Sequence, residues 1–182
     1  MKEMHKRFAT FALILAASFT PTFAYAAPAW ASVGAGCVPT GQTTKSDARF
    51  NTAGRTVFDA GNTGEIILTC PITAPIGPAG EGTVLQIAYR DPDGVSNGAR
   101  ILAALRRMNK VTGAVATFAQ FDSNSRVETT YGGGGALVPG SCGFVSPFDH
   151  NNFYYYVQIN MTRTSTSLPV ELGAVALEPT FC

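Results

Sequence analysis

Charged side chains and histidine are scarce in this chain. Asp, Glu, Lys and Arg make up 14% of the 182 residues, with 13 basic and 12 acidic residues, and there are two histidines. Three of the basic residues and one of the acidic residues lie within the first 26 positions, so the remainder carries a formal charge of −1. A nucleic-acid-binding protein needs a basic face, and a membrane-surface protein often carries a polybasic segment. We therefore expect neither partner.

Long apolar runs are confined to the N-terminus. The run "FATFALILAASF" follows Lys2, Lys6 and Arg7, and "AYA" at residues 24–26 supplies the small residues that precede a cleavage site. Residues 1–26 are thus predicted to be a signal peptide, and the mature protein to be secreted into the periplasm or the medium. No later segment reaches the roughly 18 to 20 apolar residues of a membrane span. A lipid anchor through "GAGC" is disfavoured, because glycine stands where a lipobox usually has leucine.

Closely spaced cysteine pairs are also missing, which disfavours a zinc site. All four cysteines follow the predicted signal peptide, and an even number in an exported chain indicates two disulfides. The sequence allows three pairings. We favour Cys37–Cys70, which would tie the N-terminal segment to an early strand, with Cys142–Cys182, which would hold the last residue in place.

Catalytic motifs are lacking as well. There is no G-x-S-x-G nucleophile elbow, and neither a lysine nor a helix start follows the glycine run as in a phosphate-binding loop. His150 is the single histidine after residue 26, so a triad would need it beside a serine such as Ser141 or Ser146. We expect a protein that is not an enzyme. Paired carboxylates for glycoside hydrolysis remain the open alternative, from among Asp91, Asp93, Asp122 and Asp149.

Short runs with period-two alternation, separated by glycine and proline, fill most of the chain. Residues 27–36 read as a flexible leader, and residues 37–182 as a single domain long enough to bury a substantial core. These patterns predict an all-β, antiparallel β-sandwich of jelly-roll type, with an immunoglobulin-like sandwich as the alternative. The expected strands cover residues 48–51, 55–59, 64–71, 83–90, 99–108, 114–121, 153–163 and 169–178.

Two segments are harder to assign. Within residues 99–108, Ile101, Leu105 and Met108 fit a helical stripe, and the composition favours helix. We predict a strand because both neighbours are β and the preceding "DPDGVSNG" makes a hairpin-type loop. The stretch "YGGGGALVPGSCG", residues 131–143, is predicted to be a long irregular loop.

The run "NNFYYYVQINMTR", residues 151–163, places three tyrosines in succession. In a strand Tyr155 points inward with the other odd-numbered residues, while Tyr154 and Tyr156 share the polar face. Two aromatic rings on that face can cover the apolar side of a sugar while neighbouring amides bind its hydroxyls. The alternative is a purely structural role, since tyrosine favours strands and aromatic pairs stabilise sheets. The predicted ligand-binding residues are Tyr154, Tyr156, Gln158 and Asn160.

Acidic residues gather in "RDPDGVSNG", residues 90–98. Asp91 and Asp93, with Asn97 after the turn, can supply oxygen ligands, which makes calcium the candidate cofactor. An EF-hand is excluded because its later acidic ligand is missing, and the alternative is an acidic β-turn. Two further Asp/Asn loops would form a binding rim if they lay at the same end of the sandwich: residues 121–125, "FDSNS", and residues 148–152, "FDHNN".

Two stretches resemble known exported proteins. The tail "FDHNNFYYYVQINMTRTSTSLPVELGAVAL", with its D-x-N-N-x-x-Y-Y-V-x-I pattern, resembles the closing strands of jelly-roll domains in uncharacterised secreted bacterial proteins and in some phage receptor-binding proteins. This resemblance implies non-catalytic binding at a cell surface or on a polysaccharide. Separately, "CVPTGQ" followed by "GEIILTC" resembles early strands of pilin-like and spore-coat-U-like subunits, which implies assembly by strand exchange. The ending "EPTFC" lacks the aromatic pattern that such subunits use.

The sequence therefore predicts an exported, non-catalytic module that binds carbohydrate or another surface ligand. A structural subunit of a surface assembly is the main alternative, and a glycan-active enzyme is the less favoured one. A binding module should form a monomer or a small closed oligomer, whereas an assembly subunit should polymerise.

Overall fold

The computed structural model describes residues 30–40, 47–73, 82–126, 129–143 and 146–180. The predicted signal peptide lies outside these residues. Strands make up almost all of the regular structure, with two single-turn 3-10 helices, η1 (Gly34–Gly36) and η2 (Ser123–Ser125). The strands are β1 (Trp30–Val33), β2 (Val38–Pro39), β3 (Ala48–Phe50), β4 (Thr56–Phe58), β5 (Gly64–Pro71), β6 (Gly82–Arg90), β7 (Ala99–Asn109), β8 (Val115–Asp122), β9 (Gly132–Leu137), β10 (Phe153–Arg163) and β11 (Glu171–Thr180).

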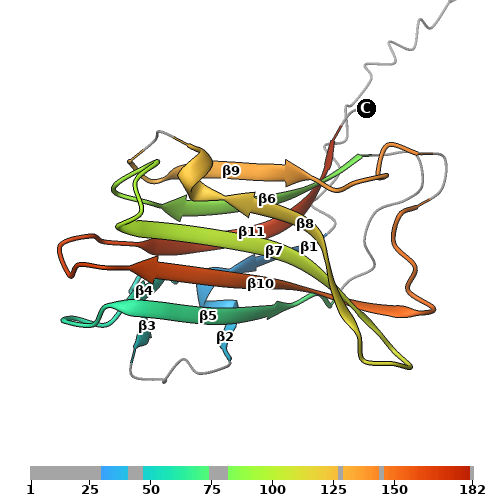
Figure 1. The fold of residues 1–182 in the computed structure, drawn as a ribbon, viewed down its shortest axis with the longest axis horizontal. Coiled ribbons are helices and arrows are strands. Elements are labelled where there is room, and N and C mark those ends of the chain that lie inside the picture. Colours follow the sequence, from blue (N-terminus) through green and yellow to red (C-terminus); the bar gives the residue numbers. More distant parts are fainter. Residues whose placement is uncertain (1–29, 41–46, 74–81, 127–128, 144–145, 181–182) are drawn as a thin grey trace, which may run out of the picture.

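The strands form two antiparallel sheets that pack face to face (Figure 1). One sheet has the order β3-β4-β11-β6-β9, with β1 on β11, and the other has the order β2-β5-β10-β7-β8. The strands form four nested antiparallel pairs, which alternate between the two sheets. The pairs are β4 with β11, β5 with β10, β6 with β9, and β7 with β8. This winding is that of a jelly roll, and it confirms the predicted fold class over the immunoglobulin-like alternative.

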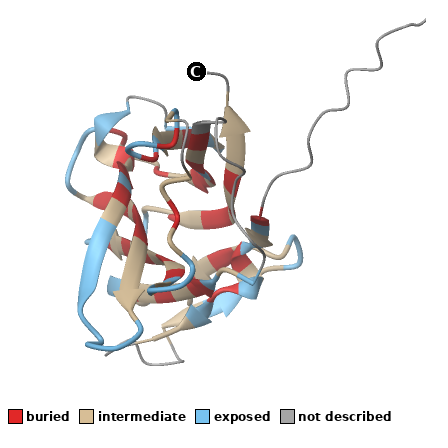
Figure 2. Cartoon of the chain, turned by 90° about the vertical axis from the view of Figure 1, so that its right-hand side faces the viewer, coloured by how far each residue is buried: buried red, intermediate tan, exposed pale blue. Residues whose placement is uncertain are grey.

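The core lies between the sheets and follows from the period-two alternation of the strands. In β10, for example, Tyr155 and the odd-numbered residues after it are buried, while the even-numbered ones are at least partly exposed. Residues 110–117, in the β7–β8 hairpin, form a continuous exposed run, pale blue in Figure 2. The largest fully buried side chains are Ile66, Leu68, Leu85, Ile87, Ile101, Leu105, Val138, Val157, Ile159, Met161, Leu172 and Leu177.

Residues 99–108 do form a strand, β7, which confirms that prediction. It pairs with β10 on one side and β8 on the other, so its backbone hydrogen bonds are satisfied within the sheet. Ile101, Ala103 and Leu105 are all fully buried. The sheet therefore overrides the helical propensity of the segment.

The prediction of an irregular loop over residues 131–143 is wrong for the first half of that segment. Gly132–Leu137 form β9, which pairs with β6 at the edge of its sheet. The reason is close approach: a side chain at Gly134 would overlap the ring of Phe121, and a Cβ at Gly135 would lie 2.8 Å from the carbonyl oxygen of Leu85. The glycine run thus allows an edge strand to lie against β8 where no larger residue fits.

The prediction of a flexible leader over residues 27–36 is wrong for residues 30–36. Trp30–Val33 form β1, which pairs with β11, and the Trp30 side chain is buried. Gly34 follows in η1 against the backbone of Leu172, where a Cβ would clash. A large apolar side chain with an open position beside β11 favours pairing over disorder.

The predicted disulfide between Cys37 and Cys70 is present, and it ties the segment after η1 to β5. Cys142 is also disulfide-bonded. Its predicted partner, Cys182, lies outside the described residues. Among the described residues, no helix has the length and apolarity needed to span a membrane.

Candidate functional site

The outward surface of the β2-β5-β10-β7-β8 sheet carries all four predicted ligand-binding residues. β10 is the central strand of this sheet, so its even-numbered side chains lie in the middle of the surface. Tyr154 is 55% exposed, whereas Tyr155 is buried in the core. The tyrosines therefore divide between the two faces as the alternation predicted.

Tyr154 and Tyr156 lie about 7 Å apart along the strand, the spacing of two residues in extended chain. Two rings at this spacing can contact neighbouring units of one extended chain ligand. The Lys110 ammonium lies 4.8 Å from the centre of the Tyr154 ring and donates to the backbone oxygen of His150. These two contacts hold the ring and the β7–β8 hairpin together.

The two amides beside the tyrosines are linked to each other. Gln158 Nε2 donates to Asn160 Oδ1 at 2.9 Å, and Asn160 Nδ2 donates to Glu65 Oε1 at 2.7 Å. These two hydrogen bonds fix the orientation of both amide groups. Among the described residues, none donates to Gln158 Oε1, so this oxygen can accept a hydrogen bond from a ligand.

Polar residues of β7 and β8 lie on the same surface and were not predicted from the sequence. Arg106 pairs with Tyr156 in the β7–β10 register, and its Nη1 donates to Thr117 Oγ1 of β8 at 2.9 Å. Gln120 lies in the row of Gln158, two strands away. The outward positions of residues 99–109 also include Leu102, Ala104 and Met108, so the sequence has no regular polar alternation there that could have indicated this surface.

The carboxylates of this surface already accept hydrogen bonds from neighbouring side chains. Both oxygens of Asp122 accept hydrogen bonds from Arg100, at 3.0 and 2.6 Å, and this contact lowers the pKa of Asp122. Glu65 accepts from Asn160 of the neighbouring strand β10. Its own strand, β5, lies three positions from the β8 strand of Asp122, about 14 Å across the sheet. That separation exceeds the span of a glycosidase carboxylate pair, about 5 to 9.5 Å.

The "FDHNN" loop lies at one end of the sandwich and is built around aromatic packing. The rings of Phe148 and His150 both lie 5.2 Å from that of Tyr155. Asp149 donates its backbone N–H to the Tyr155 hydroxyl, and burial raises the pKa of that phenol. The Asp149 carboxylate accepts from Asn152, which lowers its pKa and caps the turn.

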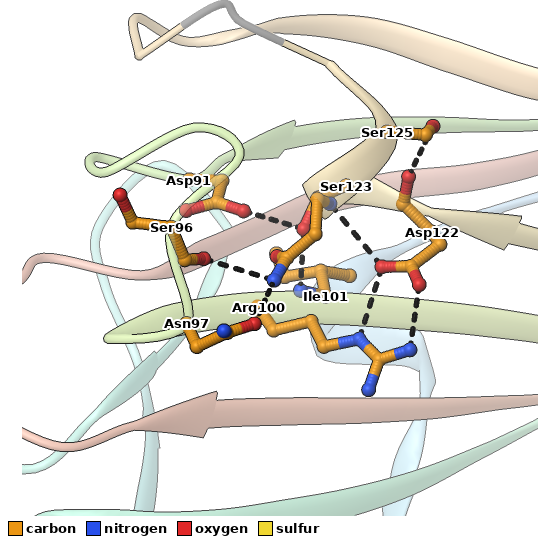
Figure 3. A network of polar contacts seen from close by, with 9 residues as sticks. Asp91, Ser96, Asn97, Arg100, Ile101, Asp122, Ser123 and Ser125 are labelled. Atoms are coloured by element: carbon orange, nitrogen blue, oxygen red, sulfur yellow. Dashed lines mark hydrogen bonds and ion pairs between the residues drawn. The ribbon is translucent and has the colours of Figure 1, made fainter.

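The "RDPDGVSNG" and "FDSNS" segments meet at the opposite end, where β10 ends and β7 begins (Figure 3). Asp91 Oδ2 accepts from the hydroxyl of Ser123. Asn124 Nδ2 donates to the backbone oxygen of Ser96 at 2.9 Å and to Asn97 Oδ1 at 3.1 Å. Two of the three Asp/Asn loops therefore converge, and the third lies at the other end.

Asp91 and Asp93 interact directly in this loop. Burial, together with the neighbouring Asp93 carboxyl, raises the pKa of Asp91 to about 6, although the Ser123 hydroxyl opposes the shift. Asp93 Oδ2 accepts the backbone N–H groups of Gly98 and Ala99, at 2.8 and 3.0 Å. Within the described residues there is no group of three or more His, Cys, Asp or Glu side chains that could hold a metal.

A pocket of about 380 Å³ lies near this same end, beside β3, β4 and the β10–β11 turn. Its most buried polar group is Arg163, whose guanidinium donates to the backbone oxygens of Asp59, Asn62 and Leu168. The guanidinium also lies 4.7 Å from the centre of the Phe58 ring. These contacts use the donors of Arg163 to hold three loops together, so the residue has a structural role.

Comparison with known proteins reveals similarity of fold only. No protein-family model and no curated protein sequence matches the chain. A family two carbohydrate esterase from Cellvibrio japonicus aligns with a TM-score of 0.39 and 11% identity over 83% of this chain, which spans only 33% of the esterase chain. A xylan-binding module, CBM15, aligns with a TM-score of 0.45 and 12% identity, covering 80% of this chain and 90% of the module. At these values the similarities do not indicate what this chain binds or does.

Proposed function

We propose that the protein is an exported, non-catalytic module that binds a glycan on the outward surface of the β2-β5-β10-β7-β8 sheet. Tyr154 and Tyr156 stack on sugar rings, and Gln158, Asn160 and Arg106 bind hydroxyl groups. The Cys37–Cys70 disulfide is consistent with an oxidising, extracellular location.

One observation carries the proposal: an exposed tyrosine and a half-buried tyrosine share one face with amides whose orientation is fixed. Sugars present apolar ring faces and hydroxyl edges, so a binding surface needs aromatic rings beside oriented donors and acceptors. The central position of β10 places this combination in the middle of the sheet, with polar residues on β7 and β8 extending it. A ligand lying along β10 would contact both tyrosines and the amides, with Arg106 beside Tyr156.

The arrangement of acidic groups favours binding over catalysis. Asp122 is paired with Arg100, and Glu65 lies too far across the sheet to act with it. Asp149 caps a turn at one end. Hydrolysis would need two carboxylates facing a common ligand, and this surface lacks that geometry among the described residues.

The test is binding of purified protein, residues 27–182 with disulfides formed, to a panel of neutral and uronic acid-containing polysaccharides. Isothermal titration calorimetry would compare the unmodified protein with Tyr154→Ala, Tyr156→Ala and the double variant. Losing a stacking ring should weaken binding about 5- to 10-fold for each tyrosine. Phe50→Ala is the matched control, because Phe50 is 50% exposed but belongs to the other sheet.

Saturable binding that falls in the tyrosine variants and persists in Phe50→Ala would support the proposal. Equal binding by all variants would place the ligand elsewhere, and no binding by any well-folded form would refute the glycan-binding role. Sedimentation velocity on the same samples addresses the alternative of an assembly subunit, for which concentration-dependent polymers are expected.

A further inference from the structure

The β6–β7 loop buries a carboxylate that has only part of its hydrogen bonding satisfied. Asp91 is 0% exposed, and its Oδ2 accepts from Ser123. The other oxygen, Oδ1, is inaccessible to solvent and accepts no hydrogen bond from the described residues. A buried carboxylate oxygen in this state is costly, because it has lost water without gaining a partner.

Two more side-chain oxygens of the β6–β7 loop and η2 are also buried without a hydrogen-bond partner in the described part of the chain. Asp93 Oδ1 and Asn124 Oδ1 are likewise buried without a hydrogen-bond donor from the described residues. In each case the other terminal atom of the group is held: Asp93 Oδ2 by two backbone N–H groups, and Asn124 Nδ2 by Ser96 and Asn97. The side chains cannot turn to satisfy the free oxygens without breaking these bonds.

The cluster also lacks a positive charge. The nearest arginine along β7, Arg100, is bound to both oxygens of Asp122. No ion pair within the described residues involves Asp91 or Asp93. Two ionised carboxylates in contact, one of them fully buried, repel each other unless a cation or a shared proton lies between them.

From these observations we propose that Asp91, Asp93 and Asn124 bind a calcium ion through their Oδ1 atoms. The ion would supply the missing positive charge and tie the β6–β7 loop to η2. Calcium fits because it takes carboxylate and amide oxygens in flexible arrangements and completes its shell with water and backbone oxygens. Magnesium fits less well, because it requires a stricter octahedron and retains its water.

This ligand set differs from the one that the sequence suggested. Asn97 Oδ1 accepts from Asn124 Nδ2, so the amide oxygen that remains free belongs to Asn124. The third ligand therefore comes from a segment about thirty residues further along the chain. The site is separate from the tyrosine surface, so this inference does not rest on the glycan-binding proposal.

Calorimetric titration of the chelator-treated, disulfide-intact protein with CaCl₂ is the direct test, and it needs no variant. We expect one calcium per chain and a rise in Tm of about 5 to 10 °C at 100-fold excess over Kd. The same titration with MgCl₂ should bind at least 10-fold more weakly. No heat and no Tm shift at millimolar calcium would overturn the proposal and leave the two carboxyls to share a proton.

Variants separate a cation site from a merely structural hydrogen-bond cluster. Asp91→Asn should abolish the calcium-dependent Tm shift, yet in chelator it should be at least as stable as the unmodified protein, because the repulsion is gone. Asp122→Asn is the matched control: it is an adjacent acidic residue bound to Arg100, and it should keep the shift. A calcium response retained in Asp91→Asn, or lost equally in Asp122→Asn, would refute the assignment.

Discussion

The glycine run of β9 predicts opposite effects for two neighbouring alanine substitutions. Gly134 is buried, and a Cβ there would overlap the ring of Phe121, which is itself buried and packed 5.4 Å from Tyr89. Gly133 is exposed, and a Cβ there would meet nothing nearer than the Ile87 carbonyl oxygen at 3.8 Å. Neither glycine has a positive φ, so alanine is sterically allowed by the backbone at both positions.

The magnitudes follow from these contacts. Inserting a methyl group into a packed site costs about 1 to 3 kcal/mol, because the aromatic ring must move off its packing partners. Replacing an exposed glycine in a compatible conformation stabilises by about 0.4 to 1 kcal/mol, because the unfolded chain loses freedom. We therefore expect Gly134→Ala to lower the free energy of unfolding by about 1 to 3 kcal/mol and Gly133→Ala to raise it slightly.

Urea unfolding with the disulfides intact, followed by far-UV circular dichroism and by tyrosine fluorescence, measures both changes. The two variants differ by one position and by no other chemistry, so each serves as the control for the other. Equal free energies of unfolding would mean that β9 does not lie against Phe121, and that residues 132–137 form the loop expected from their composition.

Three further substitutions test features away from β9. Replacing Cys37 and Cys70 together by serine should cost about 3 to 4 kcal/mol, measured by urea unfolding, because it frees a loop whose ends are 33 residues apart; unchanged stability would contradict this. Asp122→Asn should cost about 1 kcal/mol at pH 7. The pKa of Asp122 lies below 3.8 in the folded state, so its contribution is present above that pH and lost as the pH falls through the folded pKa; the variant should unfold with less acid dependence below pH 4. Arg163→Lys should cost about 1 to 3 kcal/mol, because an ammonium cannot donate to three carbonyls in the geometry of a guanidinium, and a variant as stable as the unmodified protein would mean that these bonds contribute little.

Much of the fold could be predicted from alternation in the sequence. The long strands β5, β6, β10 and β11 have clear period-two patterns, and each was expected within a few residues. β1 and β9 were missed because their formation depends on neighbours: β1 needs an open position beside β11, and β9 needs the Phe121 ring. No local pattern carries that information.

The candidate surface was predicted only along its own strand. Alternation places Tyr154 and Tyr156 on one face whatever the fold, and the structure agrees. Arg106, Thr117 and Gln120 join them through pairing register, which a single sequence does not reveal. The same limit applies to the acidic loop, since Asn124 reaches Ser96 and Asn97 of that loop only because the chain returns through β8.

The central positions of β10 and β11 have a consequence for how the chain reaches its native state. Each of these strands is flanked on both sides within its sheet, so neither sheet is continuous until the last thirty or so described residues have been added. During synthesis the earlier strands can pair only in part, and most native pairings join segments distant in sequence, which makes closure slow. Because neither sheet can be completed before β10 and β11 are present, we expect the chain to fold after its synthesis is complete and not strand by strand during it.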